Sequence, residues 1–310
     1  MRFRWLGVAL AFVLALGLAA CGSSDNSSNS STKDASQPGK GKPAVTMGAK
    51  NFTEQFILGE LYSQALKAKG YSVTLKSNIG SSEITDKALT SGQIDLYPEY
   101  TGVIATELAG TKDQPRSEQA TYDIAQKFEA KRGFTVLERT PFFDADGMAV
   151  LPAFAQKNGL RTIADLKKVG RFSFGAPPEN RTRFQGLKGL QQAYGLKKID
   201  FKPLAIGLQY TALDAGKIDT AAIFTTDAKL ASGKYTVLED TQGIFGFQNV
   251  TPVVKNSVLT AEGPAFATTL NAVSSKLTND AMQTMNAAVD IDKKKPAVVA
   301  QTFLKANGLI

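Results

Sequence analysis

Few side chains in this sequence could carry out enzyme chemistry. The chain has no histidine and one cysteine, Cys21, which excludes imidazole-based catalysis, His-ligated or Cys-rich metal sites and an intramolecular disulfide. The carboxylates of Asp144 and Asp146 could serve glycoside chemistry, but alternate residues of a strand point to opposite faces and would not converge without a bend. We therefore expect no catalytic residue, no metal and no cofactor. A secreted enzyme is the least favoured function.

The composition is that of a globular protein. Of 310 residues, 43% are hydrophobic and 21% are charged, which is enough to bury a sizeable core. The formal net charge of +8 is spread along the chain, whereas a nucleic-acid-binding protein carries a clustered basic face with interleaved aromatic residues. We expect no nucleic-acid partner. A mild positive excess is more simply explained by a role in weak attraction to anionic lipid or cell-wall polymer.

The first 20 residues have the pattern of a secretory signal. Arg2 and Arg4 supply positive charge, and the uncharged apolar run that follows is shorter than the roughly 20 residues of a membrane-spanning helix. The run ends in Leu18-Ala19-Ala20-Cys21, which resembles the lipobox of bacterial lipoproteins. We expect residues 1–20 to be removed and Cys21 to be lipidated, which would anchor the protein outside the cytoplasm on the bacterial cell membrane. An ordinary signal peptide that happens to precede a cysteine is the alternative.

Residues 21–43 predict a flexible tether that begins with the lipidated cysteine. The segment is dominated by Ser, Asn, Gly, Lys and Asp and has no large apolar residue, so it cannot fold alone. A random coil of this length has an r.m.s. reach of roughly 25 Å. The tether would let a globular body move close to a membrane surface.

Strand and helix signals alternate through the body of the chain. Apolar residues recur at helical spacing from Ile57 to Leu66, and Gly70 ends that helix. Expected strands lie at 45–47, 71–75, 94–96, 172–175, 221–224 and 253–254. Expected helix starts pair Asn51 with Glu54, Thr162 with Asp165 and Thr182 with Gln185, and a further start lies at Gly80-Ser81-Ser82. This order predicts an α/β fold with parallel sheet character, and the length of the body predicts two lobes.

Four motifs follow one another along the body. They are Gly48-Ala49-Lys50-Asn51-Phe52-Thr53-Glu54-Gln55, Asp95-Leu96-Tyr97-Pro98-Glu99-Tyr100-Thr101-Gly102, Gly207-Leu208-Gln209-Tyr210 and Phe224-Thr225-Thr226-Asp227. Together they resemble the substrate-binding proteins of bacterial osmoprotectant ABC transporters, which bind glycine betaine, choline and related quaternary amines. In the last two motifs the family usually has Gly-Leu-Arg-Tyr and Ala-Tyr-Ser-Thr-Asp. The similarity runs from about Val45 to the C-terminus.

The resemblance implies a fold, a domain organisation and a function. The fold is the two-lobed type 2 periplasmic-binding-protein architecture, with the ligand in a cleft between the lobes. The first lobe would comprise residues 44–147 and 247–310, and the second 148–246. The function would be that of a monomeric, extracytoplasmic component of an ABC importer, which captures a quaternary amine and delivers it to a permease with its ATPase subunit. A receptor of the same fold with a changed, non-betaine ligand is the main alternative.

The resemblance also implies the ligand site. A trimethylammonium group cannot donate a hydrogen bond, so the faces of aromatic rings hold it. The family's ring cage of tyrosines falls on Tyr100, on Phe224 and most nearly on Phe247, where the last two lack the hydroxyl. A further cage tyrosine falls near Asp146, and there the pattern breaks.

The carboxylate of a betaine calls for cationic or backbone N–H donors, and the resemblance places these at Lys50 and Arg183. Asp146 in place of a ring has two interpretations. It could pair directly with a cation and favour a ligand without a carboxylate, such as choline, or it could point away and pair with Lys50 or Arg183.

Overall fold

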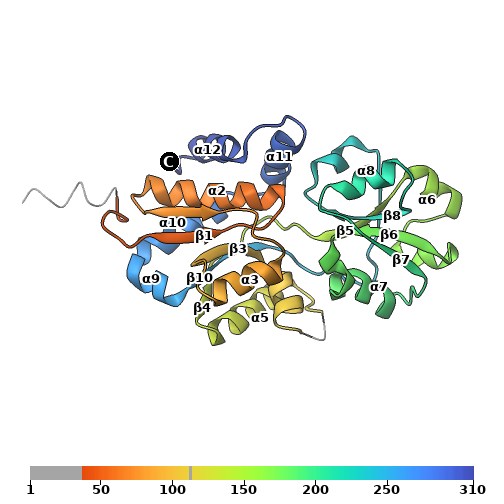
Figure 1. The fold of residues 1–310 in the computed structure, drawn as a ribbon, viewed down its shortest axis with the longest axis horizontal. Coiled ribbons are helices and arrows are strands. Elements are labelled where there is room, and N and C mark those ends of the chain that lie inside the picture. Colours follow the sequence, from red (N-terminus) through yellow and green to blue (C-terminus); the bar gives the residue numbers. More distant parts are fainter. Residues whose placement is uncertain (1–36, 112–113) are drawn as a thin grey trace, which may run out of the picture.

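The computed structural model describes residues 37–111 and 114–310 as two lobes that lie side by side (Figure 1). Each lobe is built on a five-stranded sheet with helices packed around it. The red-to-yellow and blue parts of the chain form the first lobe, and the green-to-teal part forms the second (Figure 1). The predicted two-lobed α/β fold is confirmed.

The two sheets have the same plan. Across the first sheet the strands are β2 (Val73–Lys76), β1 (Val45–Gly48), β3 (Leu96–Tyr100), β10 (Val250–Lys255) and β4 (Phe134–Val136). Across the second they are β7 (Ile199–Pro203), β6 (Phe172–Ala176), β8 (Thr220–Phe224), β5 (Asp146–Val150) and β9 (Thr236–Leu238). In each sheet the first three strands are parallel, and the fourth is antiparallel to both of its neighbours. The predicted parallel character therefore holds for three strands of each sheet.

The helices divide between the lobes in the same way. Those of the first lobe are α2 (Thr53–Ala68), α3 (Ser82–Thr90), α4 (Thr101–Val103), the π-helix η1 (Ile104–Leu108), α5 (Glu118–Lys131), α9 (Asn256–Glu262), α10 (Pro264–Ser274), α11 (Asn279–Asp290) and α12 (Pro296–Ala306). Those of the second lobe are α6 (Pro152–Asn158), η2 (Ile163–Lys168), η3 (Pro178–Arg181), η4 (Phe184–Lys188), α7 (Gly189–Gln192), α8 (Leu208–Asp214) and η5 (Ala228–Ser232).

The chain crosses between the lobes twice, and the two crossings run side by side. Residues 137–145 lead from β4 into β5, and residues 239–249 lead from β9 into β10. Phe143 forms an antiparallel bridge with Asn249, and the Asp144 N–H donates to the Gln248 carbonyl over 3.1 Å. Each crossing therefore delivers the antiparallel strand of the lobe that it enters. The residue boundaries given above for the two lobes stay a prediction.

Helix α2 shows why the first lobe holds together. Its apolar positions at helical spacing, from Ile57 to Leu66, are almost completely buried, as the sequence predicts. They pack against α10, α11 and α12, and the Tyr62 hydroxyl bonds to the Ser274 hydroxyl over 2.9 Å. Each large apolar side chain buried in this way stabilises the fold by about 1.5–3 kcal/mol relative to an exposed one.

Two of the predicted helix caps are wrong. Phe52 rather than Asn51 is the N-cap of α2, and Arg183 rather than Thr182 precedes η4; neither side chain caps its helix with a hydrogen bond. The Thr182 hydroxyl instead donates to the Glu179 carbonyl over 3.2 Å. The capping box of Thr162 with Asp165 is confirmed, although it opens a short 3-10 helix. Both wrong caps lie where the chain enters the site described below.

The first described residues form a turn against the body. The Gly39 N–H donates to the Lys69 carbonyl over 2.9 Å, and a side chain at Gly39 would come within 2.3 Å of the Tyr71 backbone nitrogen. Residues 37–43, expected as the end of the flexible tether, are therefore in contact with the end of α2. The signal sequence, Cys21 and the rest of the tether lie outside the described residues.

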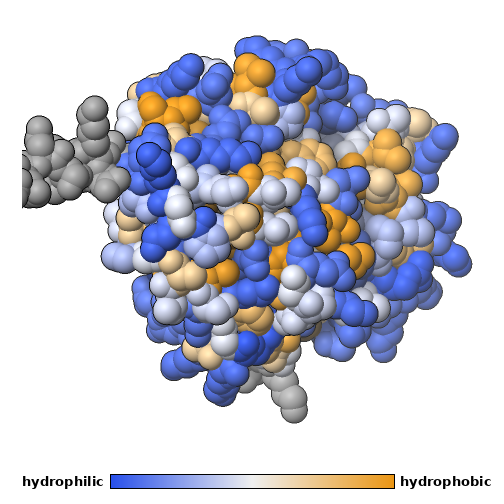
Figure 2. Space-filling view, turned by 60° about the vertical axis from the view of Figure 1, so that its left-hand side comes forward, coloured by the Kyte–Doolittle hydropathy of each residue, from blue (hydrophilic) through white to orange (hydrophobic). Residues whose placement is uncertain are grey.

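Charged and polar residues cover most of the visible face, with apolar residues in small scattered patches among them (Figure 2). Within residues 37–111 and 114–310, the helices are too short or too polar to cross a bilayer.

Candidate functional site

The sheet topology brings the carboxyl ends of four strands to the cleft. Lys50 follows β1, Tyr100 ends β3, Arg183 lies in the loop after β6, and Phe224 ends β8. Asp146 starts the antiparallel β5 and lies opposite Phe224 in the strand register. Ligands of open α/β sheets bind at this end of the strands. Residues that are far apart in the sequence therefore meet between the lobes.

A pocket between the lobes, called here the central pocket, contains five of the six predicted ligand-binding residues. Its lining consists of Lys50, Asn51, Phe52, Ser81, Ser82, Tyr100, Val103, Asp144, Asp146, Pro177, Glu179, Asn180, Arg183, Ile206, Phe224 and Gln248. Its free volume is about 40 Å³, which is room for a few water molecules. A larger solute would require side chains or lobes to move apart.

Three aromatic rings face the central pocket, and the sequence pointed to only two of them. Phe52 stacks on Phe224 with 5.4 Å between ring centroids and on Tyr100 with 6.2 Å. Phe52 is part of the first motif, but its place as N-cap of α2, which turns its ring toward the cleft, is not visible in the sequence. The three rings come from both lobes, since Phe224 belongs to the second sheet.

Lys50 is buried and already paired. Its ammonium forms an ion pair with Glu99 and donates to the Ser82 hydroxyl over 3.0 Å. It also lies over the Tyr100 ring, 4.2 Å from the centroid, which is within cation–π range. Burial lowers the pKa of Lys50, and the Glu99 carboxylate opposes that shift. The cation predicted to hold a ligand carboxylate therefore has an internal partner within the first lobe.

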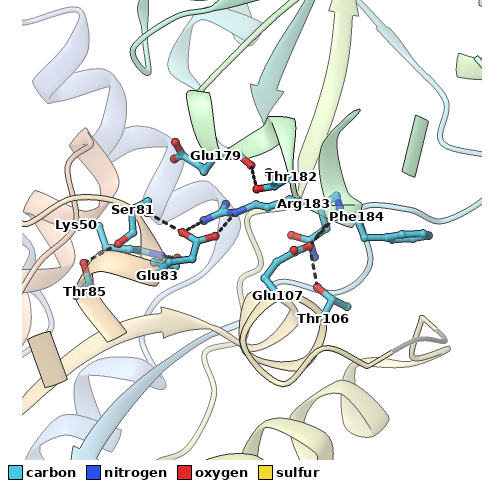
Figure 3. A network of polar contacts seen from close by, with 12 residues as sticks. Lys50, Ser81, Glu83, Thr85, Thr106, Glu107, Glu179, Thr182, Arg183 and Phe184 are labelled. Carbon is cyan, nitrogen blue, oxygen red and sulfur yellow. Dashed lines mark hydrogen bonds and ion pairs between the residues drawn. The ribbon is translucent and has the colours of Figure 1, made fainter. Parts of the chain in front are cut away.

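Arg183 is also paired, with a glutamate of the opposite lobe. Its Nε and Nη2 donate to the two carboxylate oxygens of Glu83, each over 2.9 Å. Figure 3 shows the guanidinium reaching across the cleft to Glu83. Burial raises the pKa of Glu83, but the hydrogen bonds and charge of Arg183 outweigh it and bring the value to about 2. Glu83 is therefore ionised at neutral pH.

Asp146 has no such partner. Among the described residues no lysine or arginine nitrogen lies within 4.0 Å of its carboxylate. Burial raises the pKa of Asp146 to about 6, although the more distant charges of Arg183 and Lys50 favour the ionised form. Of the two interpretations of this residue, the direct ion pair with Lys50 or Arg183 is therefore absent from the described structure.

Phe247 does not line the central pocket. Gly246 has a φ of +61°, a conformation that favours glycine, and Phe247 lines a neighbouring cavity with Phe245, on the other side of Asp146, which lines both cavities. The Phe247 carbonyl instead accepts a hydrogen bond from Thr101 over 3.3 Å. It would come within 2.5 Å of a side chain at position 102, which gives a physical reason for the glycine just after β3.

Further contacts between the lobes involve buried glutamates that the sequence did not predict at the site. Glu54 of α2 accepts from the Thr226 hydroxyl over 2.6 Å and from the Tyr100 hydroxyl over 2.8 Å. Glu107 accepts from the Phe184 backbone N–H over 3.1 Å (Figure 3). Burial raises the pKa of both glutamates. With Glu83, these side chains hold the second lobe against the first, so the cleft is closed.

The two lobes and the aromatic and charged residues in the cleft between them are consistent with a substrate-binding protein, and the family match defines the class. Residues 43–306 match the family described as the substrate binding domain of the ABC-type glycine betaine transport system, and the chain belongs to that family. The resemblance carried by the four motifs is confirmed.

The chain is similar to two curated binding proteins over most of their length. One is the glycine-betaine-binding protein of Pseudomonas aeruginosa, 31% identical over 281 residues that cover 86% of this chain and 88% of the relative. The other is the carnitine transport binding protein OpuCC of Listeria monocytogenes, 29% identical over 280 residues that cover 87% of this chain and 88% of the relative. Both are named for binding rather than for a reaction.

A solved structure described as a glycine betaine/carnitine/choline ABC transporter has a similar fold. It superposes with a TM-score of 0.67 at 27% identity, covering 86% of this chain and 99% of that one.

Proposed function

We propose that this protein is the extracytoplasmic solute-binding component of an ABC importer and that it captures a quaternary amine between its lobes. The observation that carries the proposal is the clustering of Phe52, Tyr100 and Phe224 around the central pocket. Each ring face within about 6 Å of a cation contributes roughly 0.5–2 kcal/mol. The names of the relatives, which specify glycine betaine and carnitine, support this ligand class.

Capture would proceed by a shift between open and closed states. The rings and charged groups of the pocket come from both lobes, so a ligand contacts all of them only when the cleft is closed. Such a ligand stabilises the closed state by its differential affinity for that state. The closed form would then be the one presented to a permease and its ATPase subunit.

Cys21 would hold the protein at the membrane. The lipobox-like sequence and the Ser-rich segment after it support a lipid anchor followed by a tether, with the body acting as a monomer. In the bacterial host, we expect Cys21→Ser to move the protein from the membrane fraction to the soluble or secreted fraction. Metabolic labelling with a fatty acid would check the same point, and a labelled Cys21→Ser protein would contradict it.

Thermal unfolding tests the ligand class. We expect purified protein to be stabilised by at least one of glycine betaine, proline betaine, carnitine and choline, and not by a sugar of similar size. A ligand at about 100 times its Kd stabilises the folded state by roughly 2.7 kcal/mol, which is a shift of a few degrees in Tm for a protein of this size.

A ring variant shows whether the central pocket is where the ligand binds. Because Phe52 is only partly buried and stacks on both other rings, Phe52→Leu removes a π-face while keeping apolar volume. We expect it to weaken quaternary-amine binding by about tenfold. Phe128→Leu, at a ring that lies under Arg132 in the first lobe, is the matched control. Equal losses in the two variants would place the ligand elsewhere.

A further inference from the structure

Both cations of the central pocket are neutralised by the protein's own carboxylates. Lys50 is paired with Glu99, and Arg183 is paired with Glu83. By contrast, the pocket is also lined by Asp144, Asp146 and Glu179, and none of these three has a lysine or arginine nitrogen within 4.0 Å among the described residues. Burial raises the pKa of Asp144 well above its usual range, so Asp146 and Glu179 supply the negative charge presented to a ligand, and that charge is acidic rather than balanced.

We propose that Glu83 occupies the place of a ligand carboxylate on Arg183, so that the pocket selects a quaternary ammonium cation without a carboxylate over a zwitterionic betaine. Asp146 is then the counter-ion of the bound cation. This inference rests on the proposed function, because it specifies which quaternary amines the same site takes.

The geometry makes Glu83 an effective competitor. A bidentate guanidinium–carboxylate pair is among the strongest hydrogen-bonded contacts in proteins, and Glu83 forms one with the Nε and Nη2 of Arg183. Glu83 is attached to the first lobe, so it meets Arg183 at a high effective concentration each time the cleft closes. A free carboxylate must displace it. Glu83 also accepts a hydrogen bond from the Ser81 hydroxyl over 2.6 Å, which orients it.

A cation without a carboxylate avoids that competition. It has no carboxylate to place on Arg183, so its ammonium group can bind near Phe52, Phe224 and Asp146 while Lys50 stays over the Tyr100 ring, and opposite charges in a partly desolvated pocket attract strongly. The carboxylate of a betaine would instead meet Asp146 and Glu179, and like charges in such a site repel. Discrimination of this kind uses a repulsive element together with an attractive one.

The test compares choline with glycine betaine by isothermal titration calorimetry near neutral pH. The readout is the ratio of the two Kd values, because both ligands require closure and any shared change in the closing equilibrium cancels. We expect wild-type protein to bind choline at least about tenfold more tightly. Glu83→Gln removes the charge that competes for Arg183 and should move the ratio about fivefold toward glycine betaine.

Glu118→Gln is the matched control. Glu118 is 42% exposed and pairs with Arg139 inside the first lobe, whereas Glu83 is 43% exposed and pairs across the cleft. The control removes the same charge from a similarly exposed carboxylate, so it should leave the ratio unchanged. Asp146→Asn should weaken choline binding about tenfold and affect glycine betaine less.

The possible outcomes separate the inference from the proposed function. A wild-type protein that binds glycine betaine as tightly as choline, or a Glu83→Gln ratio within about twofold of wild type, overturns the inference and leaves the quaternary-amine receptor standing. If neither choline, glycine betaine nor the other amines bind wild-type protein, the proposed function fails and the inference fails with it.

Discussion

The two ion pairs that face the central pocket differ in what they connect. Lys50 and Glu99 come from the same lobe and have side chains only 3% and 0% exposed, whereas Arg183 and Glu83 come from opposite lobes and are 11% and 43% exposed. The first pair is part of one wall of the cleft in any arrangement of the lobes. The second pair exists only when the cleft is closed. The Lys50–Glu99 pair is therefore a fixed part of the first lobe and is called here the fixed pair. The Arg183–Glu83 pair links the two lobes and is called here the latch.

The largest expected effect is the loss of the fixed pair. Glu99→Gln leaves the Lys50 ammonium buried without its counter-charge, and breaking a buried pair in this way typically costs about 3–5 kcal/mol. We expect the free energy of unfolding, measured by chemical denaturation, to fall by that amount. Glu118→Gln should have a far smaller effect, because its pair is largely solvated.

A double variant sharpens this expectation. Lys50→Met with Glu99→Gln removes the buried charge together with its partner, and well-packed apolar replacements of buried pairs are often nearly neutral. The double variant should therefore be more stable than Glu99→Gln alone. If the single and the double variant are equally destabilised, the loss of stability comes from lost packing or from the lost hydrogen bond that the Tyr100 N–H donates to Glu99 over 2.8 Å, and not from an unpaired charge.

A smaller effect concerns Asp146, the acid that belongs to neither pair. Its pKa is raised from 3.8 to about 6 in the folded protein, so the folded state binds a proton more tightly than the unfolded state. Stability from this group is present at low pH and is lost as pH rises from about 4 to about 6. Asp146→Asn should remove that slope.

At neutral pH we therefore expect Asp146→Asn to stabilise the unliganded protein by about 1–2 kcal/mol, a figure reduced for the partial exposure of the side chain. The measurement is denaturation of both proteins at a series of pH values between about 4 and 8. A difference between them that does not change over this range would show that Asp146 ionises normally. A bound cation should reverse the preference, since it favours ionised Asp146.

The sequence predicts the site residues that belong to local motifs. It does not predict the contacts that these residues make with one another. Tyr100 ends β3 and Lys50 follows β1, so the topology of the first sheet brings both to the edge that faces the cleft. Arg183 comes from the segment after β6 of the second sheet. The partner of Arg183 could not be foreseen, because Glu83 lies on a helix of the other lobe, 100 positions earlier in the chain. Phe52 was missed for a different reason. Its neighbour Asn51 has the better capping side chain, yet the helix begins one residue later.

The smallest expected change in stability comes from the latch, and it is the most informative about function. Since Glu83 is 43% exposed, its pair with Arg183 contributes less than about 1 kcal/mol to global stability. The same contribution bears directly on the closing equilibrium, where even 1 kcal/mol changes the ratio of closed to open molecules about fivefold.

We therefore expect Glu83→Gln to unfold almost like wild type while the unliganded protein shows a larger radius of gyration in small-angle X-ray scattering. Saturating ligand should bring both proteins to the same compact radius, and Glu118→Gln should match wild type throughout. An unliganded radius unchanged by Glu83→Gln would mean that Glu54 and Glu107, which also cross between the lobes, hold the cleft closed without it.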